Sequence, residues 1–145
     1  MKHSRHILAF GFLMILFVLL VSCDKDYMCQ VPIGDATCQL DPNSPLYPGI
    51  NNCDGYEYLF GGYQGIVVVR TGWNDFVAYE RTCPADSGRL DMAEGYGNIV
   101  LECPRCHSQF NTFGDGAPLS GSTTSCFLHQ YATYYDGRTL YISNF

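Results

Sequence analysis

The sequence predicts a single all-β domain, a small sandwich or barrel with two cysteine loops. From residue 56 onward, short runs of β-branched and aromatic residues are separated by turn-forming residues, which is the pattern of consecutive strands. After the N-terminal apolar run, no window of about eleven residues has the apolar spacing of an amphipathic helix. The 145 residues are enough for one core of ordinary size, so we expect one domain.

The N-terminal segment has the order of a lipoprotein signal peptide, which we expect to occupy residues 1–22. A basic start is followed by an uncharged apolar run of fifteen residues, 7–21. This run is shorter than the roughly 20 residues that a transmembrane helix needs. It ends in Leu20-Val21-Ser22-Cys23, which resembles a bacterial lipobox, whose cysteine is lipidated. We therefore expect export and a lipid anchor at Cys23 in the cell envelope; an ordinary signal peptide or a short uncleaved anchor is the alternative.

Charge and composition restrict the class of partner. The formal net charge is −6, and it becomes −8 without residues 1–22, which contain Lys2, Arg5 and no acid. An acidic chain lacks the basic face that nucleic acid requires. No Ser-His-Asp set and no phosphate-binding glycine loop with a lysine is evident. We expect an electron carrier or binding module on a membrane, with a redox or envelope protein as partner, rather than an enzyme acting by itself.

The chain after the signal peptide divides into a tether, residues 23–38, and a domain, residues 39–145. Residues up to 55 are rich in Asp, Asn, Pro and Gly, most densely at 41–49. Each proline removes a hydrogen-bond donor and favours extended geometry in the residue before it. This part therefore predicts irregular or edge structure.

The domain should contain seven strands. We expect them at residues 56–60, 65–70, 75–80, 98–102, 109–112, 127–135 and 138–143. Asp136-Gly137 between the last two predicts a hairpin, because both residue types tolerate positive φ. Residues 114–121 contain too much glycine and proline for regular structure and should form a loop.

Two segments that follow predicted strands have the composition of a metal site. One contains Cys83-Pro-Ala-Asp86 and the other Cys103-Pro-Arg-Cys106. Cysteine binds iron or zinc as thiolate, and the spacing of Cys103 and Cys106 lets one tight turn direct two sulfurs to one point. Cys83 would supply a third. If Cys23 carries lipid, four cysteines remain for two disulfides in one of three pairings: Cys29, Cys38, Cys53 and Cys126.

These loops resemble those of the Rieske iron–sulfur domain family, and the chain looks closest to the small Rieske-like lipoproteins of bacteria. That family has Cys-x-His in one loop and Cys-x-x-His in the other, typically with proline after each cysteine. Here Cys83-Pro84-Ala85 matches the first loop and Cys103 to Cys106 the second, with Ser108 and Phe110 in the expected places. The resemblance covers about residues 56–145, and includes Leu128 and Tyr131 of the following strand. It implies a [2Fe-2S] cluster and electron transfer.

The sequence departs from that family at both histidine positions, which are occupied by Ala85 and Cys106. Ala85 cannot ligate a metal, whereas Cys106 can. We expect Asp86 as the fourth ligand, with His107 or water as alternatives. The site would then hold a [2Fe-2S] cluster with non-standard ligands, a single zinc or iron, or no metal. An altered cluster would have a lower potential than a Rieske centre, because thiolate replaces neutral imidazole.

Three other interpretations remain open. The family counterparts of Cys83 and Cys103 bind one iron and lie close together, so these two could instead form a disulfide in a cluster-free, structural or binding module. Cys103-x-x-Cys106-His107 is also the attachment signature of c-type haem, although His129 is the only downstream histidine that could be the second axial ligand. A redox dithiol would need a helix start after the first cysteine, which the sequence does not indicate.

Overall fold

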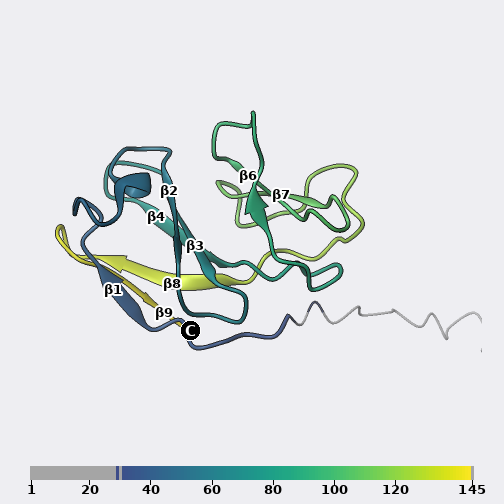
Figure 1. The fold of residues 1–145 in the computed structure, drawn as a ribbon, viewed down its shortest axis with the longest axis horizontal. Coiled ribbons are helices and arrows are strands. Elements are labelled where there is room, and N and C mark those ends of the chain that lie inside the picture. Colours follow the sequence, from purple (N-terminus) through teal and green to yellow (C-terminus); the bar gives the residue numbers. More distant parts are fainter. Residues whose placement is uncertain (1–28, 30, 145) are drawn as a thin grey trace, which may run out of the picture.

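The structure is a computed structural model that describes Cys29 and residues 31–144. In this part of the chain, nine short strands and one 3-10 helix follow one another (Figure 1). Their bounds are β1 Cys38–Leu40, η1 Pro48–Ile50, β2 Tyr56–Leu59, β3 Ile66–Arg70, β4 Phe76–Glu80, β5 Asp91–Met92, β6 Val100–Glu102, β7 Gln109–Asn111, β8 Gln130–Tyr135 and β9 Leu140–Ser143. The predicted all-β class is confirmed.

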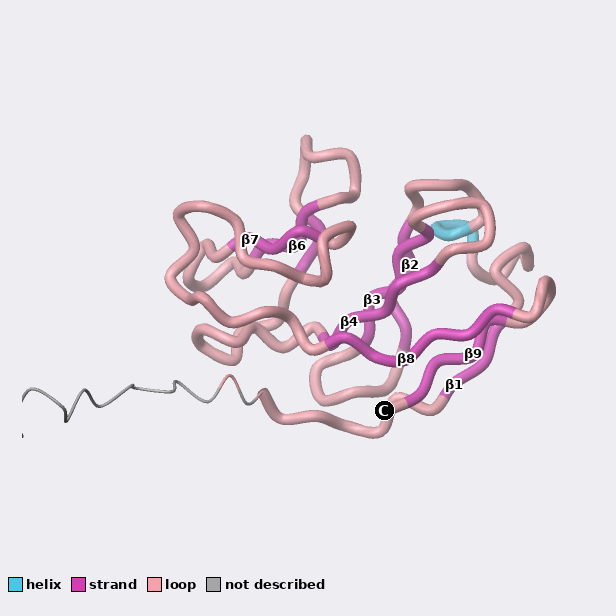
Figure 2. The backbone as a smooth tube through the Cα atoms, turned by 180° about the vertical axis from the view of Figure 1, so that it is seen from behind, coloured by secondary structure: helices cyan, strands magenta, loops and turns pink. Residues whose placement is uncertain are grey.

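The strands form two antiparallel sheets. The large sheet has six strands in the order β1-β9-β8-β4-β3-β2, and the small sheet has three in the order β5-β6-β7. Figures 1 and 2 show the small sheet beside one end of the large sheet, with the long loop between β7 and β8 leading back to the large sheet. The two cysteine loops lie after β4 and after β6, so that each sheet supplies one of them.

Strand β3 lies between two hydrophobic clusters and contributes side chains to both. Its residues Ile66, Val67, Val68 and Val69 are all fully buried, and their side chains alternate between two hydrophobic clusters. A continuous apolar run is typical of a strand that is covered on both faces. The sheet cluster consists of Ala36, Leu40, Ile50, Ile66, Val68, Phe76, Ala78, Tyr131, Leu140 and Ile142. The site cluster consists of Val67, Val69, Tyr79, Cys83, Leu90, Leu101, Cys103, Phe110 and Leu128.

The buried carboxylate of Glu80, at the end of β4, fixes the approach to the first cysteine loop. Its Oε2 accepts hydrogen bonds from the N–H of Tyr63 and the hydroxyl of Tyr131, both at 2.7 Å. Its Oε1 accepts from the N–H of Gln64 at 3.0 Å and from the N–H and hydroxyl of Thr82 at 3.0 and 2.7 Å. A fully buried carboxylate is tolerated only with such partners. These bonds fix the glycine-rich turn before β3 and the residue before Cys83.

Arg81 joins the two sheets next to this carboxylate. Its Nε donates to the carbonyl of Leu90 at 2.9 Å, and its guanidinium forms an ion pair with Asp91 in β5. The guanidinium carbon also lies 3.6 Å from the ring centroid of Tyr58, whose hydroxyl accepts a 2.7 Å hydrogen bond from the N–H of Met92. The large sheet and the small sheet are therefore connected by side chains of β2 and the β4 end as well as by the chain.

All seven predicted strands occur, and each is shorter than expected by one to three residues. The hairpin at Asp136-Gly137 is confirmed, since Tyr135 pairs with Leu140. Only Gly137 uses positive φ, at 97°, while the Asp136 carboxylate accepts from the N–H groups after it. β1, β5 and the 3-10 helix are additional. They are too short to leave a periodic pattern in the sequence.

The segment predicted as a tether, residues 23–38, is partly built into the domain. Ala36 is a fully buried member of the sheet cluster, and the carbonyl of Asp35 accepts a 2.8 Å hydrogen bond from the N–H of Gly62. A disulfide joins Cys29 to Cys126. Cys29 and Ala36 therefore take part in the packing of the domain although they precede residue 39.

The second predicted disulfide is not formed within the described residues, where Cys38 and Cys53 are both free. The predicted signal peptide and Cys23 lie outside the described residues. Among the residues that are described, no helix has the length and apolar character to span a membrane.

Candidate metal site

The first cysteine loop, residues 83–88, is a tight turn closed by its own backbone. The N–H of Cys83 donates to the carbonyl of Gly88 at 2.7 Å, and the N–H of Ser87 donates to the carbonyl of Cys83 at 2.9 Å. Ser87 has φ of 57°, in the left-handed region. A Cβ on Gly88 would lie 2.8 Å from the sulfur of Cys103, so glycine permits the close approach of the second loop.

The second loop, residues 103–108, has the same backbone. The N–H of Cys103 donates to the carbonyl of Ser108 at 3.0 Å, the N–H of His107 donates to the carbonyl of Cys103 at 2.8 Å, and His107 has φ of 57°. The buried hydroxyl of Ser108 accepts from the N–H of Thr123 at 3.0 Å and contacts its hydroxyl at 2.8 Å. The two loops are therefore the same turn, with a candidate ligand at its first and fourth positions.

These four positions bring together Cys83, Asp86, Cys103 and Cys106, whose ligand atoms all lie within 4.8 Å of one another. The sulfurs of Cys83 and Cys106 are 3.7 Å apart, and the sulfur of Cys103 is 3.3 Å from Oδ1 of Asp86. Zn–S bonds of about 2.3 Å and Zn–O bonds of about 2.0 Å give tetrahedral edges of about 3.8 Å between sulfurs and about 3.5 Å between sulfur and oxygen. These two separations match the edges of a single tetrahedral site.

Backbone N–H groups point at all four ligand atoms in the same pattern in both loops. The sulfurs of Cys83 and Cys103 each accept from the N–H groups two and three residues later. Asp86 and Cys106 each accept from the N–H group two residues later, which for Asp86 is a 2.8 Å bond. Hydrogen bonds to the charged form of a group stabilise that form, so each turn is suited to holding two anionic ligands.

The two buried candidate ligands, Cys83 and Cys103 (the inner ligands), differ in pKa from the two partly exposed ones, Asp86 and Cys106 (the outer ligands). Burial raises the pKa of the Cys83 thiol and of the Cys103 thiol, which are both fully buried. Burial acts to raise the pKa of Cys106, but hydrogen bonds with Ser108 and with the neighbouring thiols lower it below its ordinary value. Burial raises the pKa of Asp86, but the N–H of Gly88, the adjacent thiols and the charge of Arg105 together lower it below its ordinary value. Cys106 and Asp86 ionise more readily, whereas the inner thiols would lose their protons when a cation binds.

The outer side of the site reaches the surface. Cys106 and Asp86 are partly exposed, and Nε of the exposed Arg105 lies 3.6 Å from Oδ2 of Asp86. Ala85 is exposed and offers no ligand atom. His107, which the sequence left open as a fourth ligand, lies outside the group: its ring is 76% exposed and its Nδ1 is 3.1 Å from Oε1 of Glu102.

Sequence reasoning placed the four side chains in two loops but missed that the loops are the same turn. The signal was present, because Cys-Pro-x-x-x followed by Gly88 or Ser108 occurs twice. It also missed the anchors of the loops, Glu80 and Thr123, because a buried acid and an exposed hydroxyl carry no pattern that identifies their partners. Cys83 and Cys103 are not joined by a disulfide.

Comparison with known proteins gives structural likeness at low sequence identity. No protein-family model matches the chain, and no curated protein matches it. Among solved structures, the chain is similar to the ferredoxin of carbazole 1,9a-dioxygenase from Nocardioides aromaticivorans IC177. The identity is 20% and the TM-score 0.49, over 65% of this chain and 88% of that chain. The all-β class of this chain rests on its own strand pairings.

Proposed function

We propose that this protein is an envelope metal-binding protein that holds one ion through Cys83, Asp86, Cys103 and Cys106 and acts in electron transfer when that ion is iron. The observation that carries this proposal is the group of four ligand atoms within 4.8 Å, taken from equivalent positions of two equivalent turns. Three thiolates and a carboxylate are ligands of both zinc and iron.

The ligand spacing supports one ion more than the binuclear cluster that the Rieske resemblance implies. In a [2Fe-2S] centre each iron binds one pair of protein ligands. The two pairs therefore lie on opposite sides of the cluster. In the resembling family, Cys83 and Cys103 would form one pair and the residues at positions 85 and 106 the other. Here Cys83 lies 3.7 Å from Cys106, across that division, and Ala85 has no donor atom.

The chain's own residues suit a cation that is held by anionic ligands close to the surface. N–H groups stabilise the thiolates, and the site cluster excludes water from the inner two ligands. Cys106 is partly exposed and gives a short path to a partner. Bound iron would supply a one-electron couple, whereas zinc would be redox-inert. The N-terminal motif ending in Cys23 supports anchoring to the envelope membrane, outside the cytoplasm.

The same geometry favours metal ligation over haem attachment. In the haem interpretation, Cys103 and Cys106 bond to the porphyrin and His107 ligates its iron. Cys103 is instead fully buried, and both thiols face Cys83 and Asp86. The His107 ring points to Glu102 on the surface.

Metal and sulfide analysis of the full-length protein, purified in detergent, tests the proposal. We expect about one iron or zinc per chain and no acid-labile sulfide, with tetrahedral cobalt bands after replacement by Co²⁺. Cys103→Ser should lose the metal, whereas Cys53→Ser, which removes an exposed free thiol outside the group, should keep it.

Each other result has a definite meaning. Two irons and two sulfides per chain would support a [2Fe-2S] cluster instead. A metal-free protein with Cys83 and Cys103 linked in a disulfide would support the cluster-free structural module. Unchanged metal content in the Cys83→Ser, Cys103→Ser double variant would contradict any role of these cysteines.

A further inference from the structure

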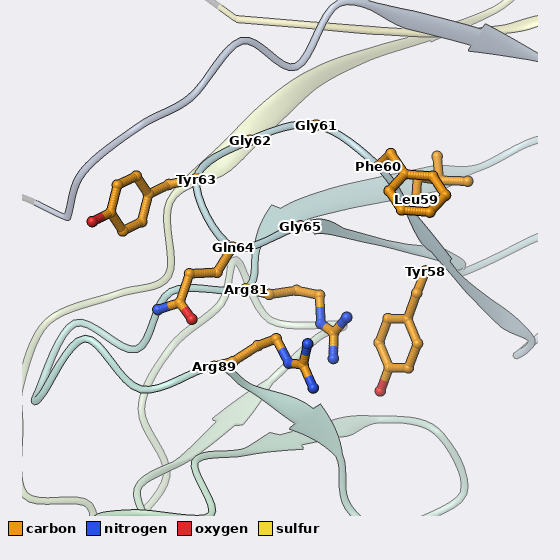
Figure 3. Close-up of a pocket in the computed structure, with 10 residues that line it drawn as sticks. All are labelled: Tyr58, Leu59, Phe60, Gly61, Gly62, Tyr63, Gln64, Gly65, Arg81 and Arg89. Carbon is orange, nitrogen blue, oxygen red and sulfur yellow. The ribbon is translucent and has the colours of Figure 1, made fainter.

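A cavity lies beneath the glycine-rich turn of residues 61–65, and Arg81 and Arg89, which flank the first cysteine loop in the sequence, also line it. Its volume is about 580 Å³, which is within the roughly 300–1,000 Å³ of typical small-molecule sites. Figure 3 shows the guanidinium groups of Arg81 and Arg89 close together beneath the turn, with Tyr58 on one side and Gln64 on the other. Two cations thus line one cavity in a chain whose net charge is −6.

The two arginines are not equivalent. Arg81 is paired with Asp91 and packs on the ring of Tyr58, so its charge is neutralised locally. Arg89 is exposed, and its side chain has no ion pair or hydrogen bond with any residue that the structure describes. The cavity therefore offers one guanidinium charge that is open to an anion. Guanidinium pairs with carboxylate through two parallel hydrogen bonds.

The rest of the lining is suited to an apolar body. Tyr58, Leu59 and Phe60 line the cavity on the β2 side, and Phe60 is fully exposed at its rim. An exposed aromatic side chain and an unpaired cation at different parts of one cavity suit a ligand that has an apolar end and an anionic end. A bare inorganic anion would leave this wall uncovered.

The cavity is held in shape before any ligand arrives. The carboxylate of Glu80 holds the N–H groups of Tyr63 and Gln64 in the turn. The side-chain amide of Gln64 donates to the carbonyl of Ser87 at 2.6 Å, which joins the turn to the first cysteine loop. Preorganisation lowers the entropic cost of binding.

We infer that this cavity binds a small organic monocarboxylate with an aromatic or aliphatic body, with Arg89 pairing to the carboxylate and Tyr58 and Phe60 covering the body. Arg81 and Asp91 form a neutral pair in its wall. This site uses none of the four candidate metal ligands, so its failure would leave the proposed metal site untouched.

Calorimetric titration of the full-length protein in detergent, with a detergent-only blank, tests this inference. Benzoate is the probe, benzyl alcohol is a neutral molecule with the same body, and inorganic phosphate is an anion without one. We expect saturable binding of one benzoate per chain, at least tenfold tighter than benzyl alcohol or phosphate.

Matched variants locate the site. Arg89→Gln should weaken benzoate binding at least tenfold, and Arg89→Lys should retain part of the affinity, since it keeps the charge but loses the two-bond geometry. Arg138→Gln removes the same charge from an exposed hairpin turn and should leave the affinity within twofold. No saturable benzoate binding, equal effects of Arg89→Gln and Arg138→Gln, or phosphate binding as tight as benzoate binding would each overturn the inference.

Discussion

The two cysteine loops share one backbone and differ in their side chains. Both close on the first cysteine and both place a left-handed residue at the fifth position, Ser87 in one and His107 in the other. The fourth position is Asp86 in the first loop and Cys106 in the second. The backbone therefore determines where the ligand atom lies, while the side chain at that position determines which ions the site prefers.

The loops also differ in how they are attached to the domain. The first is tied to the large sheet through the buried carboxylate of Glu80, which accepts both donors of Thr82. The second is tied by Ser108 to Thr123 in the loop that returns to the large sheet. A buried charged acceptor holds one loop and a neutral hydroxyl pair holds the other, so the two attachments should differ in strength.

The largest expected effect is a difference in Zn²⁺ affinity between variants of the two fourth-position ligands, Cys106 and Asp86. Zinc binding to four-ligand peptides contributes about 10–16 kcal/mol, so one thiolate accounts for about 3–4 kcal/mol, or several hundred-fold in affinity. Cys106→Ala should therefore weaken Zn²⁺ binding several hundred-fold. Asp86→Ala should weaken it about tenfold, because water replaces a carboxylate more easily than a thiolate. Competition with a chromophoric chelator measures both, with Cys53→Ala as control; equal losses would contradict the difference between the loops.

The first positions should make metal affinity depend on pH. Burial raises the pKa of both Cys83 and Cys103, so both thiols carry protons at neutral pH in the metal-free protein and release them on binding. Each released proton gives about a tenfold rise in affinity per pH unit, so these two thiols alone should make Zn²⁺ affinity rise by at least about 100-fold per unit between pH 6 and 8 and fall correspondingly on acidification. The same chelator competition at three pH values tests this. A flat profile would mean that these thiols are not ligands.

Disrupting the attachment of the first loop should lower the free energy of unfolding about twice as much as disrupting that of the second. Glu80→Gln replaces one accepting carboxylate oxygen by an NH₂ group, which would then face N–H and hydroxyl donors inside the core. It should lower the free energy of unfolding by about 3 kcal/mol. Ser108→Ala loses neutral hydrogen bonds and should cost about 1.5 kcal/mol. Urea denaturation of the metal-free, thiol-reduced protein measures both. Glu94→Gln, at an exposed acid between β5 and β6, is the control and should change stability by less than about 0.5 kcal/mol.

The smallest expected effect is on stability, and it tests whether the left-handed fifth residues of the two loops, Ser87 and His107, are equivalent. A left-handed conformation costs a non-glycine residue about 1 kcal/mol, and glycine removes this cost while adding entropy to the unfolded chain. Ser87→Gly and His107→Gly should each raise stability by about 0.5 kcal/mol and keep the metal. Ser120→Gly, an exposed position without positive φ, should lower it slightly. Loss of metal in His107→Gly would instead support the haem interpretation.

Local patterns in the sequence predicted the strands and the hairpin at Gly137, which the structure contains. Asp86 as the fourth ligand, in preference to His107 or water, stays a prediction. No local pattern indicated that Ala36 enters the sheet cluster, because it does so through contacts with residues distant in the chain. The disulfide of Cys29 with Cys126 spans 97 residues, and cysteine spacing alone leaves such pairings open.

The sequence by itself determined the strands, the two turns and their four candidate ligands, because alternation, turn residues and cysteine spacing act within a few residues. Only the tertiary structure decided that the turns face each other and that Cys83 and Cys103 are buried while Cys106 and Asp86 reach the surface. It also decided that the Arg89 side chain has no partner among the described residues. The physical reason is that burial, ligand separation and charge pairing depend on how the two sheets pack. That packing is set by contacts such as those of Glu80 and Arg81, whose partners no local pattern identifies.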